Sequence, residues 1–268
     1  MKKPTLVSSR SDPASSNICE HVKEALGSKP KAKEISGAEV LEYPELRIVE
    51  VEGELIEYVP REELLEEASF FIYLSRHESA SGAKSLTVHT PGLILNHKAS
   101  FSIANPPLAS SLLCKIAQLR ESIELEYHVS FEATHHGPVL EAPITFVEIG
   151  SSKDAWTDPR AGKLLASAVL GVLREGSWLK GENCVGVGGG HYAAKFTKNL
   201  IEERKLLYGH ILSKHQIEEH VVDIVLEAVE KTSGGCRTIA IDKKGLKGER
   251  RREVKELAEK LGLKVVKV

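Results

Sequence analysis

Short apolar runs alternate with amphipathic stretches along most of the chain. The apolar runs have the continuous or alternating pattern of strands, and they lie at residues 5–9, 69–74, 85–90, 125–134, 144–152 and 183–187. Between them, apolar residues recur every three or four positions at 110–122 and 160–175, as in helices that pack on a sheet. This alternation predicts an α/β fold with a mainly parallel or mixed central sheet and helices on both faces.

A hairpin is predicted ahead of the strand at 69–74. Residues 47–51 and 55–59 both have strand character, and the charged turn Glu52–Gly53–Glu54 separates them. Two such segments joined by a short glycine-containing turn are typical of antiparallel strands that pair with each other. The pattern therefore predicts a hairpin whose outer positions are charged.

The end of the chain repeats the alternation on a smaller scale. The pattern there predicts a helix, a strand, a basic helix and a last strand, at residues 216–231, 238–242, 248–261 and 263–268. We expect one catalytic domain over residues 1–268. Within it, residues 212–268 form either an extension of the sheet edge or a small lobe.

The composition excludes several classes of protein. A chain of 268 residues with 41% hydrophobic residues can bury a sizeable core, and it contains no apolar run near the roughly 20 residues needed to cross a bilayer. Its four cysteines are far apart and include no Cys-x-x-Cys pair, which argues against a cysteine-built zinc site and for reduced thiols. We therefore expect a cytoplasmic protein that is not associated with a membrane.

Charge is distributed unevenly along the chain. The net charge is only −2, but residues 39–67 hold 11 acidic and 2 basic residues, and residues 231–268 hold 12 basic and 5 acidic ones. The basic residues that could follow a nucleic-acid backbone are Lys247, Arg250, Arg251 and Arg252. A solvated helix face would have the same composition, so both interpretations stay open.

Histidines recur where the predicted strands end. The motifs are Ser75–Ser79 around His77, Thr87–Gly92 around His89, Thr134–Pro138 around His135 and His136, Gly188–Tyr192 around His191, and Tyr208–His210. Ligands in α/β sheets lie beyond the carboxyl ends of the strands, so one cleft can contain these rings. Neutral imidazole ligates zinc and carries protons near neutral pH, which indicates a site that activates water.

Glu148 belongs to the same set of candidates. It interrupts an otherwise apolar strand, and a buried carboxylate is costly unless it is paired or bound to a metal. The chain has no His-Glu-x-x-His helix, so a zinc site here depends on the constellation of residues rather than on one motif. The glycines at 186–190 have neither P-loop nor dinucleotide-binding spacing.

Taken in order, these motifs resemble the archaeal and plant type of D-aminoacyl-tRNA deacylase. The residues that carry the resemblance are Ser8–Ser15, Ser75–Ser79, Leu86–Gly92, Glu132–Pro138, Glu148–Ser152 with Trp156, Gly188–Ala193 and Gly209–His210. One departure is Ala194, where relatives are expected to have proline. The resemblance implies a three-layer α/β fold similar to the phosphorylase and peptidyl-tRNA hydrolase group. It also implies a zinc-containing hydrolase that releases the D-amino acid from tRNA.

The resemblance leads to a set of expected roles. The metal candidates are His135, His191, Glu148 and His210, and the catalytic candidates are Arg76, His77, His89 and His136. The substrate-binding candidates are Ser9, Asp12, Ser15, Asn17, Gly189 and Gly190, of which the residues from Ser9 to Asn17 would contact the terminal adenosine. The expected partner is D-aminoacyl-tRNA, bound by a monomer without an obligate protein partner.

Two alternatives stay open at this point. One is another enzyme on a similar fold, either a nucleoside phosphorylase or a zinc peptidase-like hydrolase. The other is a non-catalytic RNA-binding module that has kept the histidines without turnover.

Overall fold

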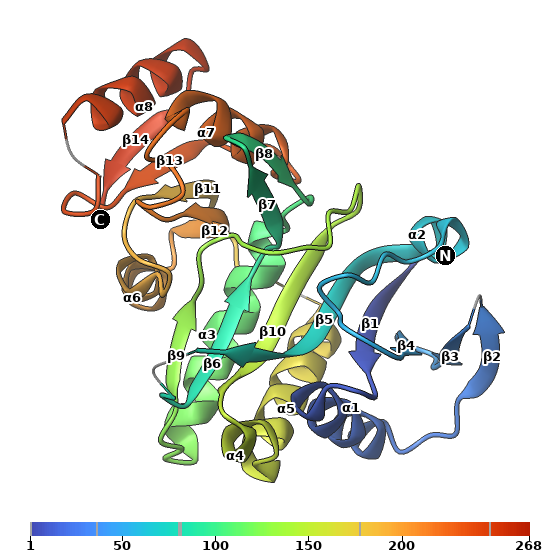
Figure 1. Ribbon diagram of the computed structural model, residues 1–268. Helices are drawn as coiled ribbons and strands as arrows, with labels where there is room; N and C mark the ends of the chain where they lie inside the picture. The colour runs from blue at the N-terminus through green and yellow to red at the C-terminus, as the bar shows by residue number, and fades with distance from the viewer. Residues whose placement is uncertain (1, 36, 80–81, 177, 247) are drawn as a thin grey trace.

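The large sheet of the molecule has eight strands. The structure is a computed structural model that describes residues 2–35, 37–79, 82–176, 178–246 and 248–268. The strands of this sheet are β1 (Lys3–Ser9), β2 (Lys31–Ile35), β3 (Ala38–Glu42), β4 (Arg47–Val51), β5 (Ala68–Glu78), β6 (Ser85–His89), β9 (His128–Phe131) and β10 (Ile144–Ser151). Their order is β2-β3-β4-β1-β5-β10-β6-β9 (Figure 1).

Strand directions make this sheet a mixed one with a parallel centre. β4, β1, β5 and β10 are parallel neighbours, whereas β6 runs antiparallel to β10 and β9 runs parallel to β6. At the other edge, β2 and β3 are antiparallel. The α/β fold with a mainly parallel or mixed central sheet, predicted from the apolar pattern, is confirmed.

One face of the large sheet is covered by three helices. They are α1 (Pro13–Leu26), α3 (Pro106–Ser122) and α5 (Pro159–Glu175), which lie side by side with the short α4 (Lys153–Trp156) near them (Figure 1). Each of the three has an Asp or Asn N-cap whose side chain accepts a backbone N–H, followed by proline at the first helical position. These local signals fix where the covering layer begins.

The opposite face of this sheet is left to irregular segments. Alternate strand residues such as Val7, Tyr73 and Phe146 point to this face, where they form a second core with Leu55 and Leu140. The short helix α2 (Glu62–Glu67) also packs there. Because loops rather than long helices cover this face, it has room for a cavity.

The chain from Glu182 onward forms a separate, fully parallel sheet. Its strands are β11 (Glu182–Val187), β12 (Leu206–Leu212), β13 (Thr238–Ile241) and β14 (Lys264–Lys267), in the order β12-β11-β13-β14. The helices α6 (Ala194–Glu203), α7 (Val221–Glu230) and α8 (Gly248–Lys260) accompany it, and the hairpin of β7 (Gly92–Leu95) and β8 (Lys98–Phe101) packs on α7. This sheet begins before residue 212 and has its own core.

The predicted hairpin of residues 47–51 and 55–59 is wrong. β4 lies between β1 and β3, so both of its edges are already occupied. Residues 52–60 instead form turns, closed by backbone hydrogen bonds from Glu57 to Glu54 and from Tyr58 to Leu55. Within the described part of the chain, none of the helices is long and apolar enough to cross a membrane.

Candidate active site

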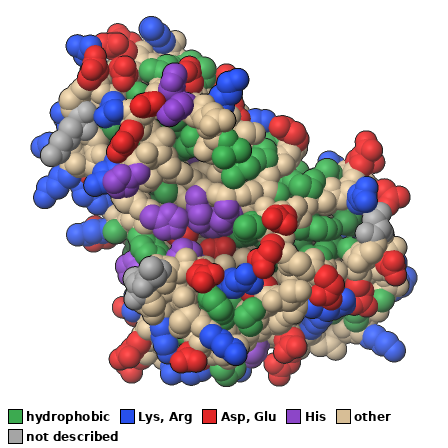
Figure 2. All heavy atoms as spheres, in the orientation of Figure 1, with side chains coloured by type: hydrophobic (Ala, Val, Ile, Leu, Met, Phe, Trp, Pro, Cys, Tyr) green, Lys and Arg blue, Asp and Glu red, His purple; other side chains and the backbone are tan. Residues whose placement is uncertain are grey.

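Strand register brings the predicted residues together on the loop-covered face. In β10, Glu148 pairs with Ser75 of β5 and with Thr87 of β6, and Phe146 pairs with His89. Paired residues of neighbouring strands point to the same face of a sheet. The cavity there has a volume of about 310 Å³ and is lined by Asp12, Glu54, Leu55, Ile56, Ser75, Arg76, His77, Glu78, His135, His136, Glu148 and His191. Figure 2 shows histidines gathered across the middle of one face, with carboxylates beside them.

Glu132 lies among three histidines at the centre of the site. Its Oε1 is 3.2 Å from His77 Nδ1, and its Oε2 is 3.1 Å from His191 Nε2 and 3.6 Å from His135 Nε2. The side chain is 1% exposed. An isolated bridge between Glu132 and Tyr192 brings the loop after β11 against the edge of the large sheet. Two sheets therefore contribute to one site.

Glu148 is the second buried carboxyl. It lies 3.6 Å from His77 Nδ1, 3.9 Å from His89 Nδ1 and 4.0 Å from His136 Nε2. Together with Glu132 and its neighbours this gives one group, which we call the histidine–glutamate cluster: His77, His89, His135, His136, His191, Glu132 and Glu148.

The hydrogen-bond acceptors around His136 and His89 determine which of their ring nitrogens carry protons. His136 Nδ1 lies 2.6 Å from the Gly137 carbonyl, which can only accept, so this nitrogen carries a proton and Nε2 offers a lone pair. His89 Nε2, at 3.2 Å from that lone pair, must donate to it. The lone pair of His89 Nδ1 then faces Glu148 Oε2, and neither atom has a hydrogen-bond partner among the described residues.

The cluster provides ligand atoms in the number and kind that a metal ion needs. One ligand atom each from His77, Glu132, His135 and His191 lie within 4.8 Å of one another, as do those of His89, His135 and His136 and those of His89, Glu132 and Glu148. Both carboxylate oxygens of Glu132 are buried without a hydrogen-bond partner among the described residues. Buried polar atoms are normally satisfied, so the donor set fits a cation such as zinc.

Burial keeps the imidazoles neutral. It lowers the pKa of His77 and His136, lowers that of His89 well below the ordinary value, and, helped by the neighbouring His136, lowers that of His135 to about 3. At neutral pH these rings therefore keep a lone pair that can bind a metal ion or accept a proton.

The two buried carboxyls respond to burial in opposite ways. Burial alone would raise the pKa of Glu132, but the three imidazoles around it outweigh burial and lower the pKa. Burial raises the pKa of Glu148 well above its ordinary value, and the carboxylates of Glu132 and Asp12 raise it further. Two neighbouring carboxyls whose surroundings shift their pKa values in opposite directions are the arrangement of an acid–base pair.

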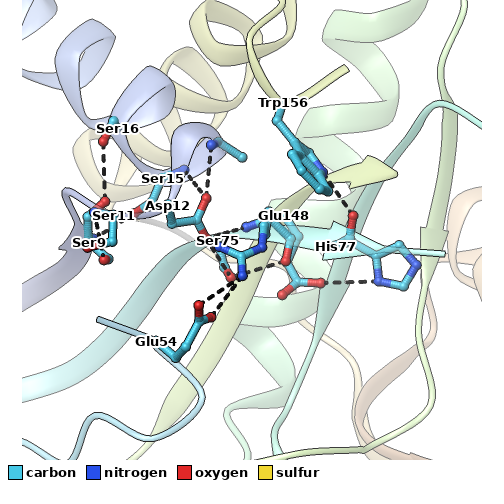
Figure 3. Close-up of polar contacts among 12 residues, drawn as sticks. Ser9, Ser11, Asp12, Ser15, Ser16, Glu54, Ser75, His77, Glu148 and Trp156 are labelled. Atoms are coloured by element: carbon cyan, nitrogen blue, oxygen red, sulfur yellow. Dashed lines mark hydrogen bonds and ion pairs between the residues drawn. The ribbon is translucent and has the colours of Figure 1, made fainter. Parts of the chain in front are cut away.

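A network of charged side chains forms one wall of the cavity (Figure 3). Asp12 Oδ1 accepts the backbone N–H groups of Ala14 and Ser15, and its Oδ2 accepts the Arg76 N–H at 2.8 Å. The Arg76 guanidinium donates to both oxygens of Glu54 at 3.0 Å. Asp12 thus connects the start of α1 to the end of β5 and holds Arg76 at the cavity.

Comparison with known proteins gives the family. Residues 64–266 match the family model described as D-aminoacyl-tRNA deacylase. A relative of that name from Pyrococcus furiosus is 34% identical over 273 residues, with 98% of each chain covered. One from Methanosarcina mazei is 35% identical over 280 residues and covers 99% of this chain and 92% of its own. The chain belongs to the D-aminoacyl-tRNA deacylase family.

The resemblance inferred from the motifs is thereby confirmed, and the fold agrees. A crystal structure of a conserved protein of unknown function superposes with a TM-score of 0.90 at 26% identity, and the match covers 99% of this chain and 95% of that one. The deacylase-family relationship thus extends over both sheets of the molecule.

His210 lies apart from the histidine–glutamate cluster. It is in the middle of β12 rather than after a strand, and its ring is fully buried against Phe101. Its Nε2 is 3.1 Å from the Ser102 carbonyl and its Nδ1 is 3.0 Å from Thr134 Oγ1. Both nitrogens are engaged, so the expectation that His210 ligates a metal is not supported by the structure.

The serines and the asparagine expected to bind substrate are used inside the fold. Ser9 N–H donates to Ser15 Oγ at 2.8 Å, and Ser9 Oγ donates to the Gly53 carbonyl. Asn17 donates to the carbonyls of Trp156 and Asp158, and in this way it fastens α1 to α4 and α5. Of the four candidates from Ser9 to Asn17, the structure brings Asp12 to the cavity.

The remaining expectations concern glycines and basic residues. Gly189 and Gly190 are absent from the cavity lining, and they carry the chain from β11 to His191. Arg250, Arg251 and Arg252 lie on α8, where Arg252 is within 3.6 Å of Glu249 and 3.5 Å of Glu256. Lys247 lies outside the described residues.

Several residues of the site were not among the sequence candidates, and three of them are Glu132, Tyr192 and Glu54. Glu132 follows β9 at a position where alternation predicts a solvent-facing side chain, but the loop of His191 and Tyr192 covers it. The Tyr192 hydroxyl is 3.0 Å from His77 Nε2 and orients that ring. Glu54 comes from the segment mistaken for a hairpin. For Glu132, the His-His motif three residues later was the available signal.

Proposed function

We propose that the chain hydrolyses the ester bond of D-aminoacyl-tRNA, releasing the D-amino acid and free tRNA, and that the histidine–glutamate cluster is its active site. Family membership supports the reaction. The observation that carries the assignment of the site is the convergence of five histidines and two buried glutamates on one cavity. We place the reaction in the cytoplasm, where charged tRNA is used, and a single copy of the chain suffices for the cavity.

The metal is zinc, held by His77, Glu132, His135 and His191. This set replaces Glu148 and His210 of the sequence expectation, and the burial of both Glu132 oxygens among three imidazoles supports it. Zinc bound there supplies a Lewis acid and lowers the pKa of a bound water.

The protein side chains manage orientation and protons. The Tyr192 hydroxyl orients His77, and the Ala133 carbonyl, 2.8 Å from His135 Nδ1, directs His135 Nε2 toward Glu132. Ester hydrolysis consumes one water and must deliver a proton to the departing ribose oxygen. Glu148 lines the cavity and burial raises its pKa, so it is the group that takes up the proton of the attacking water and passes a proton to the ribose oxygen.

The walls seat the substrate. Arg76 is the cation for the ester oxyanion or the terminal phosphate, and Glu54 is its resting partner. Leu55 and Ile56 give the cavity an apolar side for the amino-acid side chain, and Asp12 is the member of the Ser9–Asn17 loop that faces the terminal adenosine.

The test is release of labelled tyrosine from D-tyrosyl-tRNA and from L-tyrosyl-tRNA. We expect rapid release from the D-ester, sparing of the L-ester, and a loss of about 10³-fold in kcat/KM for His135→Ala. The control is His21→Ala, because His21 lies on α1 outside the cavity and bonds only its own helix. Stripping zinc should abolish release and adding it back should restore it.

Several outcomes would contradict this function. Product formation that depends on inorganic phosphate would identify a phosphorylase, and tight binding of tRNA without turnover would identify a binding module. Full activity after complete removal of metal would refute the role of zinc alone.

A further inference from the structure

A second concavity lies at the carboxyl ends of the parallel strands of the smaller sheet. β11, β12 and β13 run in the same direction, so the loops that follow them meet at one edge. Backbone hydrogen bonds join these loops: Gly188 N–H to the Leu212 carbonyl at 2.8 Å, and Lys214 N–H to the Gly189 carbonyl at 3.0 Å. This edge is the usual ligand position of a parallel sheet.

The cavity at this edge is rich in positive charge. Its volume is about 350 Å³, and it is lined by Lys214, His215, Glu218, Lys244, Gly245, Leu246 and Arg250, which we call the basic pocket. In the described part of the chain, Lys214, Lys244 and Arg250 have no carboxylate within 4.0 Å, and Glu218 lies 3.7 Å from His215. Three unpaired cations around one concavity form a site for an anion.

The backbone around the basic pocket is tightly fixed. A Cβ on Gly245 would come within 2.8 Å of Gly189 Cα and 2.9 Å of Asp242 Oδ2, so only glycine lets the two loops pack together. Of the carboxylates in these loops, Glu218 lies beside His215, and Asp242 is paired with Lys195 and accepts the Lys244 N–H at 2.9 Å. The Asp242 carboxylate is therefore paired within the loops and does not offset the positive charge of the pocket.

The basic pocket adjoins the histidine–glutamate cluster through the chain itself. Gly189, on which the pocket loops pack, precedes His191 by two residues, so their Cα atoms are at most about 7 Å apart. Figure 2 shows Lys and Arg side chains next to histidines on this face. An extended ligand with its reactive end in the cluster can reach the pocket.

We propose that the basic pocket binds a phosphodiester group of the tRNA acceptor end while the aminoacyl ester lies in the cluster; this rests on the proposed function. Arg250 provides a planar fork for phosphate oxygens, and Lys214 and Lys244 provide point charges. The basic residues of α8 therefore have different roles. Arg250 faces the pocket, whereas Arg252 is committed to Glu249 and Glu256.

The experiment compares two substrates, D-tyrosyl-tRNA and the D-tyrosyl ester of adenosine, which has no phosphodiester. For Lys244→Ala with Arg250→Ala, the ratio of kcat/KM for tRNA to that for the adenosine ester should fall by about 10- to 100-fold, through KM. The slope of log(kcat/KM) against log[salt] for tRNA should become shallower by about 1, because one phosphate is no longer neutralised.

The matched control removes the same charge elsewhere on α8. Lys255→Ala with Lys260→Ala changes two exposed lysines that do not line the pocket, and it should keep the wild-type ratio. An equal loss in the control, an equal loss on both substrates, or no loss with tRNA would overturn the proposal. Binding of uncharged tRNA, measured for both variants, tests the pocket even if the wild type hydrolyses neither ester, in which case the proposed function fails separately.

Discussion

The histidine–glutamate cluster lies on a face of the large sheet and the basic pocket lies beyond the strand ends of the small one, and the two differ in how they hold charge. Glu132 and Glu148 are each 1% exposed and surrounded by imidazole rings, whereas Lys214, Lys244 and Arg250 are exposed. In a buried medium of low polarity, charges and dipoles interact strongly, which suits the first region to catalysis. Exposed positive charges are screened by water and salt but still attract a polyanion, which suits the second region to binding one.

The two regions also differ in what they contribute to stability. Buried ionisable groups oppose folding unless their neighbours compensate them, whereas exposed lysines contribute little. Substitutions in the cluster should therefore change kcat and stability together. Substitutions in the basic pocket should change KM and its dependence on salt.

The largest contrast is expected from Glu132→Gln. The amide keeps the shape but removes the negatively charged ligand among three histidines, so kcat/KM should fall by about 10³-fold and bound zinc should fall with it. The measurement is tyrosine release together with zinc per mole of protein. Glu126→Gln, an exposed neighbour in the chain, is the matched control, and equal zinc in both variants would remove Glu132 from the ligand set.

A smaller effect is expected from His210, the buried histidine of the second sheet. Burial lowers its pKa to about 4, below the ordinary 6.5. As the pH falls through 6.5 the unfolded chain takes up the proton first, so the free energy of unfolding decreases between pH 6.5 and 4, by about 3 kcal/mol for this group.

His210→Gln removes this titratable group, so its proton uptake no longer contributes to the pH dependence of the free energy of unfolding. Urea unfolding followed by tryptophan fluorescence between pH 6 and 4.5 should show a slope about 1.4 kcal/mol per pH unit shallower than in the wild type. An unchanged slope would mean that His210 is not a neutral ring with both nitrogens hydrogen-bonded. Zinc content should stay at the wild-type level, which distinguishes this histidine from those of the cluster.

The smallest effect is expected where the two regions touch, at Tyr192. Tyr192→Phe removes the hydroxyl that orients His77, a loss of about 1 kcal/mol and hence of several-fold in kcat. KM for tRNA should not change, in contrast to the variants of the basic pocket. A change confined to KM would place Tyr192 in substrate binding rather than in the orientation of His77.

Local pattern was sufficient for much of the fold. Helices such as α5 combine an apolar stripe with an Asp–Pro start, and both signals are contained in the residues themselves. The hairpin at 47–59 failed because pairing is a tertiary choice: β4 is held between β1 and β3, which a single segment cannot reveal. The beginning of the second sheet at Glu182 depends in the same way on which strands meet.

The site shows the same division between local and distant information. His77, His135, His136, His191 and Glu148 line one cavity, as the motifs predicted, but strands of opposite direction and of two sheets bring them there rather than one common strand edge. Glu132 could not be predicted, because its strand alternates as if that face met solvent and a loop from the other sheet covers it. His210 was misassigned because the glycine before it suggested a turn, whereas Gly209 and His210 both lie within β12.

The bridge between Glu132 and Tyr192 sets a time at which activity can begin. During synthesis the ribosome makes the strands of the large sheet first, and His191 with Tyr192 emerges only after them. Until then Glu132 lacks a ring and the cover that buries it, so a nascent chain has an incomplete site. The newly made chain therefore completes the cluster only when both sheets have assembled.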